Sequence, residues 1–210
     1  MIRVLLVDDH RLVRASLRSV LDAADGLEVV GESASGEDAL ARARVDQPDV
    51  ILMDVNMPGI GGLEATRKLC AAAPETRVIA LTAHRDDPYP AQMLDAGASG
   101  YLTKDCEPDE LVDAIRRVVA GETWIEGAVA RRIAGERLAG KPGETPFDAL
   151  SAREMQVLQM VTQGHATKDI AEALQLSPKT VATYRYRLYE KLGVANDVEL
   201  TRFALRHGIG

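Results

Sequence analysis

The sequence predicts an α/β domain with a parallel sheet, followed by a small all-α domain. In the first 120 residues, five short aliphatic runs alternate with segments of helical pattern. This alternation is typical of a parallel sheet that helices cover on both faces. In the last third, the helix starts carry clear capping residues and no strand pattern remains. A length of 210 residues is long for one domain and suits two.

The five predicted strands are short, and each is followed by a segment with helical spacing. The strands are expected at residues 3–7, 27–30, 49–53, 77–81 and 99–103. The helices are expected at residues 11–24, 36–45, 62–72, 88–96 and 107–120. Five β/α units of this size suit the flavodoxin-like strand order 2-1-3-4-5 for a domain at residues 1–120. The Pro-rich stretch 84–90 is expected to delay or distort the fourth helix.

A linker is expected at residues 121–147, with one short helix within 126–138 and an irregular Gly- and Pro-rich end at 139–147. The final domain, residues 148–210, is predicted to be helical. Its helices are expected at residues 152–162, 167–174, 178–192 and 197–206. The predicted caps are Ser151 with Glu154, Ser177 before Pro178, and Asn196 with Glu199. The second and third helices are separated by a very short turn, which predicts a helix-turn-helix.

The charge is distributed unevenly over the two predicted domains. The chain carries −7 overall, with −8 in residues 1–120 and +1 in residues 121–210, and a basic cluster lies within 177–192. An acidic front and a locally basic rear indicate different partners for the two domains. The chain has no apolar run of membrane-spanning length and no secretory signal at its start. Cys70 and Cys106 form no metal-type cluster, so we expect a reduced, cytoplasmic setting.

Carboxylates end two of the predicted strands. Asp8 and Asp9 follow the first strand, and Asp54 follows the third. In the order 2-1-3 these strands are neighbours, so the three carboxylates are expected to converge at one edge of the sheet. A cluster of this kind resists full ionisation, and a divalent cation relieves the repulsion. Oxygen-only ligands suit Mg²⁺.

The ends of the fourth and fifth strands carry groups that suit phosphoryl chemistry. Thr82 ends the fourth strand and Lys104 follows the fifth. A metal ion and Lys104 would neutralise phosphoryl oxygens, and Thr82 would donate a hydrogen bond. Asp54 is then an acyl-phosphate nucleophile. A single acid at a strand end is more often a solvated loop residue, and Lys104 by itself would be a surface lysine. Here acids, a hydroxyl and a lysine follow one another at the strand ends across five β/α units. This combination favours a site for phosphoryl chemistry over isolated surface residues.

Besides a signalling protein that is phosphorylated on Asp54, two other classes of function remain open. A Mg²⁺-dependent phosphohydrolase of the haloacid dehalogenase type also uses an Asp at a strand end, but it has a second Asp two residues later. Asn56 occupies that position here, so no carboxylate stands ready to activate water. An RNA-binding or scaffold protein is the other alternative. The capped turn and the basic helix favour DNA.

Several segments resemble known families. "VLLVDDH", "VILMDVNMPGIGGLEATRKL", "ALTAH" and "GYLTKD" resemble the receiver domain of two-component response regulators. Residues 150–194 resemble the LuxR-type helix-turn-helix. Together they look like the NarL/FixJ class of response regulators, and within it the GacA/UvrY subgroup. The resemblance implies a DNA-binding transcriptional regulator that accepts and slowly loses its own aspartyl phosphate, and not a turnover enzyme.

The resemblance also implies roles for residues of the first domain. Asp54 would be the phosphoacceptor, and Lys104 would pair with the phosphate. Thr82 and Tyr101 would form a switch pair, in which Tyr101 turns inward when the phosphoryl group arrives. The Mg²⁺ ligands would be Asp8, partly through water, with Asp9, Asp54 and the backbone carbonyl of Asn56. Many receivers have a proline after the lysine, whereas Asp105 follows here.

The third helix of the second domain is the expected DNA-binding element. Val181, Leu188 and Leu192 recur at helical spacing and should face the core. The expected phosphate contacts are Lys179, Thr180, Arg185, Arg187 and Lys191. The resemblance places base contacts at Ala182, Thr183 and Tyr186. Arg185 stands where LuxR-type helices often have an apolar residue, so its stem is expected to lie over the core edge.

The expected partners follow from the same resemblance. They are a sensor histidine kinase, of the hybrid GacS/BarA type if the subgroup assignment is right, and double-stranded DNA that includes promoters of small regulatory RNAs. A homodimer is expected when the protein is phosphorylated or DNA-bound. The unphosphorylated receiver is expected to restrain the DNA-binding domain.

Overall fold

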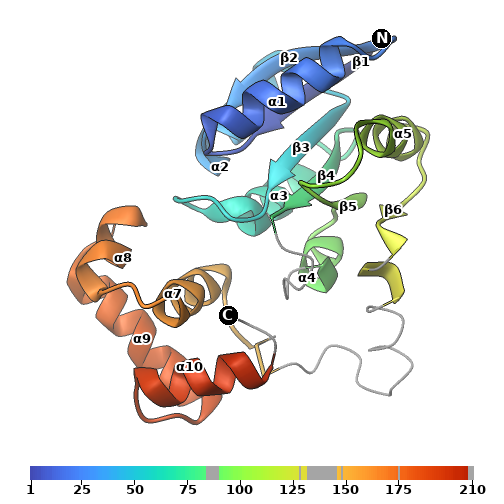
Figure 1. Cartoon of the computed structure of the whole chain (residues 1–210). Helices are drawn as coiled ribbons and strands as arrows, with labels where there is room; N and C mark the ends of the chain where they lie inside the picture. The colour runs from blue at the N-terminus through green and yellow to red at the C-terminus, as the bar shows by residue number, and fades with distance from the viewer. Residues whose placement is uncertain (84–89, 128, 132–145, 148, 175, 208–210) are drawn as a thin grey trace. The chain divides into compact units, whose positions relative to one another are not determined.

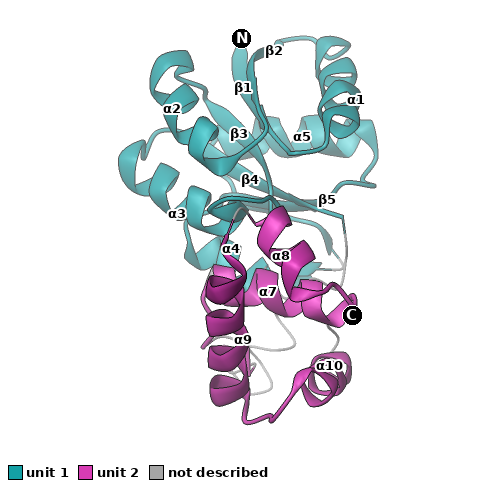
Figure 2. Ribbon diagram, turned by 90° about the vertical axis from the view of Figure 1, so that its left-hand side faces the viewer, with its two compact units in different colours: residues 1–85, 89–135 teal, residues 86–88, 136–210 magenta. Residues whose placement is uncertain are grey.

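The computed structural model describes the chain except residues 84–89, 128, 132–145, 148, 175 and 208–210. The described residues divide into two compact units (Figure 2). The first contains the described residues up to Arg131, and the second contains those from Pro146 onward. Each unit has its own buried apolar residues.

The first unit is built on a parallel sheet with the order β2-β1-β3-β4-β5-β6 (Figure 1). The strands are β1 Ile2–Val7, β2 Leu27–Ser33, β3 Val50–Asp54, β4 Arg77–Thr82, β5 Gly100–Thr103 and β6 Trp124–Ile125. The predicted order 2-1-3-4-5 is confirmed. The short sixth strand was not predicted, and it lies within the stretch expected to be linker.

Helices cover both faces of this sheet. They are α1 Arg11–Asp22, α2 Gly36–Asp46, α3 Gly61–Ala72, α4 Pro90–Asp95 and α5 Pro108–Val119. The strand residues alternate between two cores. Leu6 and Leu52 point toward the core that α1 and α5 complete, whereas Leu5 and Ile51 point toward the core that α2 and α3 complete. Every residue of β3 is buried, since β3 is an inner strand covered on both sides.

The second unit is helical, with α7 Ala152–Thr162, α8 Thr167–Ala173, α9 Pro178–Leu192 and α10 Asp197–Arg206. The predicted helix-turn-helix is formed by α8 and α9. Ser151 and Glu154 form the predicted reciprocal capping box, and the Ser177 hydroxyl accepts a hydrogen bond from the amide of Thr180. Asn196 also caps as predicted, but the Glu199 carboxylate accepts its return bond from the amide of Ala195 and not from Asn196.

Most of the predicted linker helix at 126–138 lies outside the described residues. Within the described part of this segment, residues 127 and 129–131 are helical. The irregular segment expected at 139–147 and the start of the predicted fourth helix at 88–89 also fall largely outside them. The described part of that helix begins at Pro90. Among the described helices, none combines the length and apolar character that a bilayer crossing requires.

Candidate functional site

The predicted carboxylates meet at the carboxyl edge of the sheet. Asp54 is the last residue of β3 and Asp8 follows the neighbouring strand β1. Their side chains are almost fully buried, with exposed fractions of 2% for Asp54 and 1% for Asp8. Asp9 is more open, and one ligand atom from each of Asp8, Asp9, His10 and Asp54 lies within 4.8 Å of the others. The parallel order therefore brings together the acids that the sequence predicted.

Lys104 joins the two buried carboxylates. Its Nζ lies 2.7 Å from Asp8 Oδ2 and 2.9 Å from Asp54 Oδ2. The backbone amide of Lys104 donates to the carbonyl of Thr82 at 2.7 Å. The strand end that carries the ammonium group is thereby fixed to the end of β4, and the predicted lysine faces the acids.

Charge in this site is only partly balanced. Burial raises the pKa of Asp54 to about 6, and the nearby Asp8 carboxylate adds to the rise, while Lys104 opposes it. Burial disfavours the charged form of Lys104, but Asp54 and Asp8 outweigh this effect and raise the pKa of the ammonium group. Among the described residues, Lys104 contacts Asp8 and Asp54 but not Asp9, so the three carboxylates carry more negative charge than this ammonium group balances.

Backbone groups orient the carboxylates. The amide of His10 donates to Asp8 Oδ1 at 2.7 Å, and the amide of Asn56 donates to Asp54 Oδ1 at 3.1 Å. At the start of α3, a Cβ on Gly62 would lie 2.0 Å from the carbonyl oxygen of Asp54. Only glycine permits this approach, so the "GIGG" stretch allows α3 to begin directly against the end of β3.

The two predicted switch residues are both inside the unit. Thr82 is the last residue of β4, and Tyr101 lies in β5. Both have an exposed fraction of 0%. Tyr101 therefore lies in an inward position.

Two residues beside the acids were not predicted from the sequence. The Nδ1 atom of His10 lies 2.8 Å from Asp9 Oδ1, and the guanidinium of Arg14 donates to the backbone carbonyl of Asp8 at 2.6 Å. The position of His10 directly after the paired acids was the available signal. Arg14 lies one helical turn further on, and nothing in the sequence pattern marked it.

The residues present fit a divalent cation. Carboxylate oxygens dominate the donor set, two of the acids are buried, and the negative charge exceeds what Lys104 neutralises. These are the conditions in which a hard cation such as Mg²⁺ stabilises a site. The backbone carbonyl of Asn56 stays a predicted ligand.

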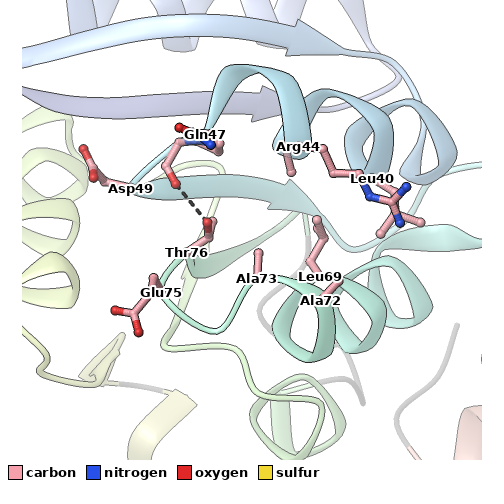
Figure 3. A pocket seen from close by; sticks show the side chains of 11 residues that line it. Leu40, Arg44, Gln47, Asp49, Leu69, Ala72, Ala73, Glu75 and Thr76 are labelled. Carbon is pink, nitrogen blue, oxygen red and sulfur yellow. Dashed lines mark hydrogen bonds between the residues drawn. The ribbon is translucent and has the colours of Figure 1, made fainter.

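A hollow lies at the amino ends of β3 and β4, at the opposite ends of the strands from the acids. It has a volume of about 420 Å³ between α2, α3 and the residues that precede β3 and β4 (Figure 3). Its floor is apolar, with Leu40 and Leu69, and its rim is charged, with Arg44, Asp49 and Glu75. Thr76 donates to the carbonyl of Pro48 across it at 3.0 Å. None of the residues predicted for phosphoryl chemistry lines this hollow.

In the second unit, α9 buries Val181, Leu188 and Leu192 as predicted. The opposite face of the helix is exposed. It presents Lys179, Ala182, Thr183, Tyr186 and Arg187 to solvent. Tyr186 is 61% exposed, although it is a large aromatic residue. Exposed aromatic side chains of this size commonly mark a binding surface.

Two residues predicted to contact phosphates have partners within the domain. Arg185 forms an ion pair with Asp197 at the start of α10 and a hydrogen bond with the hydroxyl of Thr167. Lys191 lies 2.6 Å from the buried carboxylate of Glu154 and donates to the carbonyl of Ala149 at 2.8 Å. Both side chains hold α9 to its own domain. Thr180 is half-buried, and its hydroxyl lies 2.8 Å from that of Ser177.

Comparison with known proteins agrees with this geometry. Residues 4–116 match the response regulator receiver domain, and residues 148–204 match the bacterial regulatory proteins of the luxR family. The response regulator UvrY of Escherichia coli K12 is 49% identical over 209 residues, which cover 100% of this chain and 96% of UvrY. The response regulator GacA of Pseudomonas aeruginosa is 48% identical over 209 residues, with 100% and 98% covered.

Among solved structures, RcsB of Salmonella enterica serovar Typhimurium, bound to a promoter with the phosphomimetic BeF3⁻, is similar over 96% of this chain and 97% of its own. The sequence identity is 26% and the TM-score is 0.66. The two sequence matches cover the two units one by one, and the relatives extend over the whole chain. This chain therefore belongs to the two-component response regulators that join a receiver domain to a LuxR-type helix-turn-helix DNA-binding domain.

Proposed function

We propose that Asp54 accepts a phosphoryl group from a sensor histidine kinase and that this modification controls DNA binding by α9. One observation carries the assignment of Asp54. Its carboxylate is buried at the end of an inner strand, 2.9 Å from the ammonium group of Lys104. An acid in this setting combines a nucleophilic oxygen with a fixed cation for the incoming negative charge.

In the proposed reaction, an oxygen of Asp54 attacks the phosphorus atom, and the bond from phosphorus to the donor breaks. The donor imidazole leaves with the electron pair of that bond. Lys104 then balances charge on the phosphoryl oxygens, and the Thr82 hydroxyl donates a hydrogen bond to one of them. Mg²⁺ held by Asp8, Asp9, Asp54 and the carbonyl of Asn56 would neutralise further charge. Asn56 supplies no carboxylate to activate water, so the acyl phosphate persists as a signal.

The proposed DNA contacts divide by location on α9. Ala182, Thr183 and Tyr186 would meet base edges in a major groove, and Lys179 and Arg187 would contact phosphates. Thr180, Arg185 and Lys191 stay proposed phosphate contacts, although their present partners lie within the domain. The promoter-bound state of the RcsB relative supports DNA as the partner. We further propose that the protein binds paired half-sites as a homodimer. Its kinase would be a hybrid sensor of the GacS/BarA type, and the protein would act in the cytoplasm.

The test of the phosphorylation site uses a small-molecule phosphodonor. Incubation with acetyl phosphate and Mg²⁺ should add one phosphoryl group per chain, labile to hydroxylamine, and peptide mapping should place it on Asp54. Asp54→Asn should not label. Lys104→Ala should lose some stability, because the buried Asp8 and Asp54 lose their nearby cation, and its DNA binding should no longer respond to acetyl phosphate at all. Label on another residue, or label without a divalent cation, would contradict the assignment.

A further inference from the structure

We propose that Glu126 is a positioning residue for Lys104, so that the segment leading out of the first unit holds the phosphorylation site in shape. The inference rests on the phosphorylation of Asp54 proposed above. It starts from β6, which lies beside β5 at the outer edge of the sheet (Figure 1). The residue directly after β6 is Glu126.

Backbone bonds place Glu126 beside the end of β5. The amide of Trp124 donates to the carbonyl of Ser99 at 3.0 Å, and the amide of Glu126 donates to the carbonyl of Tyr101 at 3.1 Å. The Glu126 side chain then extends past the end of this short ladder. Its Oε2 atom accepts hydrogen bonds from the hydroxyl of Thr103 at 2.8 Å and from the amide of Thr103 at 3.3 Å.

These bonds act on the residue next to the catalytic lysine. Thr103 has an exposed fraction of 0% and directly precedes Lys104. On the side that faces β4, the backbone amide of Lys104 donates to the backbone carbonyl of Thr82. The strand end is therefore held on one side by Thr82 and on the other by Glu126. Loss of the Glu126 carboxylate would remove an acceptor from two buried donors, which favours displacement of the strand end toward water.

The same segment contains a reporter. Trp124 is the only tryptophan in the chain. Its ring packs against the core that α1 and α5 complete, and the guanidinium of Arg117 lies 4.9 Å from the ring centroid. A movement of β6 relative to β5 changes the polarity around this indole, so its emission follows the attachment of the segment to the sheet.

The experiment compares Glu126→Ala, Glu126→Gln and the control Glu122→Ala in the full-length protein. The control removes the same charge from an exposed site, 60% exposed, four residues earlier. The rate of labelling by acetyl phosphate and Mg²⁺ is measured, with hydrogen exchange of the Thr103 amide and the change in Trp124 emission on labelling. Glu126→Ala should label roughly tenfold more slowly, as the loss of one or two hydrogen bonds implies.

Glu126→Ala should also exchange the Thr103 amide faster and lose most of the emission change. Glu126→Gln should stay close to wild type, because its amide oxygen still accepts from Thr103. Glu122→Ala should match wild type in labelling rate and in Thr103 exchange, the two readouts that do not depend on its partner Arg117 beside Trp124. Equal labelling rates for Glu126→Ala and Glu122→Ala would overturn the inference, and so would faster exchange without slower labelling. If Glu126→Ala does not fold, Thr103→Val provides the same comparison by removing only the hydroxyl. A wild-type protein that does not label at all would instead refute the proposed function, before any variant is compared.

Discussion

Asp54 occupies a site that disfavours its charged form. Burial raises the pKa of this carboxyl to about 6 from an ordinary value of 3.8. A carboxyl with a raised pKa in the folded state opposes folding once it ionises. The penalty is absent at a pH below the unfolded value, it grows as the pH rises from about 4 to 6, and it is complete above this window. The ionised form of the proposed nucleophile therefore lowers the stability of the fold.

The first prediction concerns this penalty. In buffer without divalent cations at pH 7, Asp54→Asn should raise the free energy of unfolding by roughly 1–3 kcal/mol, because the amide has the shape of the protonated acid. The difference in the free energy of unfolding between the variant and the wild type should shrink as the pH falls toward 4. It should also shrink when Mg²⁺ is added, because the ion stabilises the wild type. Urea unfolding at several pH values measures it. A gain that does not change with pH would show that the charge of Asp54 is not its cause.

The second prediction separates two lysines of α9. Lys191 neutralises the buried carboxylate of Glu154, whereas Lys179 is exposed on the opposite face. Lys191→Ala should therefore destabilise the second unit by about 1–3 kcal/mol, because a buried carboxylate loses its cation. Lys179→Ala should keep stability and should flatten the salt dependence of DNA affinity by roughly one phosphate contact. Thermal unfolding and binding at several salt concentrations test both variants. An unchanged stability in Lys191→Ala would contradict the structural role of its ion pair with Glu154.

At the scale of the elements, the junction of β3 and α3 shapes the proposed phosphorylation site. The third prediction is that Gly62→Ala lowers the free energy of unfolding by roughly 2–4 kcal/mol, since its Cβ would collide with backbone atoms at Asp54 and Val55. Labelling by acetyl phosphate should fall as well, because the end of β3 must move. Gly127→Ala is the matched control, since the nearest atom to its added Cβ is 3.8 Å away. If the two substitutions lowered stability and labelling equally, the close approach of α3 to the end of β3 could not be the cause of the losses.

The exposed face of α9 carries the fourth prediction. Tyr186→Ala should cost about 1–3 kcal/mol of affinity on a preferred promoter and little on random DNA. Thr183→Ala should cost less than Tyr186→Ala, because the Thr183 hydroxyl already donates to the carbonyl of Lys179 at 3.0 Å. Affinities on both DNAs test the ranking. Equal losses on both DNAs would indicate that these side chains contact only the DNA backbone.

The elements that the sequence predicted well are those with a local physical signal. Five strands were found because parallel strands buried on both faces are continuous aliphatic runs, and the caps at Ser151 and Ser177 mark helix starts directly. The strand β6 was missed because two residues carry no periodicity. The ion pair of Lys191 with Glu154 joins residues 37 positions apart, so no local pattern could show it. The bonds of Glu126 to Thr103 were missed for the same reason.

At the scale of the whole molecule, the two units carry different charge, −8 in residues 1–120 and +1 in residues 121–210. The second unit has its own core, and Phe147 closes it by packing edge-on against the rings of Phe203 and His207. The carbonyl of Ala149 also accepts from Lys191. The amino-terminal boundary of a stable DNA-binding fragment therefore lies before Phe147.

The fifth prediction is that a fragment from Pro146 to the end binds a preferred promoter without phosphorylation, and more tightly than the unphosphorylated full-length protein. Removal of a tethered acidic domain would end the expected restraint on the DNA-binding domain and would also remove charge repulsion near DNA. A fragment from Leu150 should be less stable, because it lacks Phe147. Affinity of the three proteins at one salt concentration tests this. If fragment and full-length protein bind equally, dimerisation alone carries the switch.

The partners of Arg185 and Lys191 have a consequence for the speed and discrimination of DNA binding. Because α9 is tied to α10 through Asp197 and to α7 through Glu154, the helix backbone is already ordered before DNA arrives. Association then loses conformational entropy mainly in a few exposed side chains, and little in the main chain. A preorganised helix of this kind meets right and wrong sequences at similar rates. Selection among promoters should therefore reside in the lifetime of each complex, which the fit of Tyr186 and its neighbours determines.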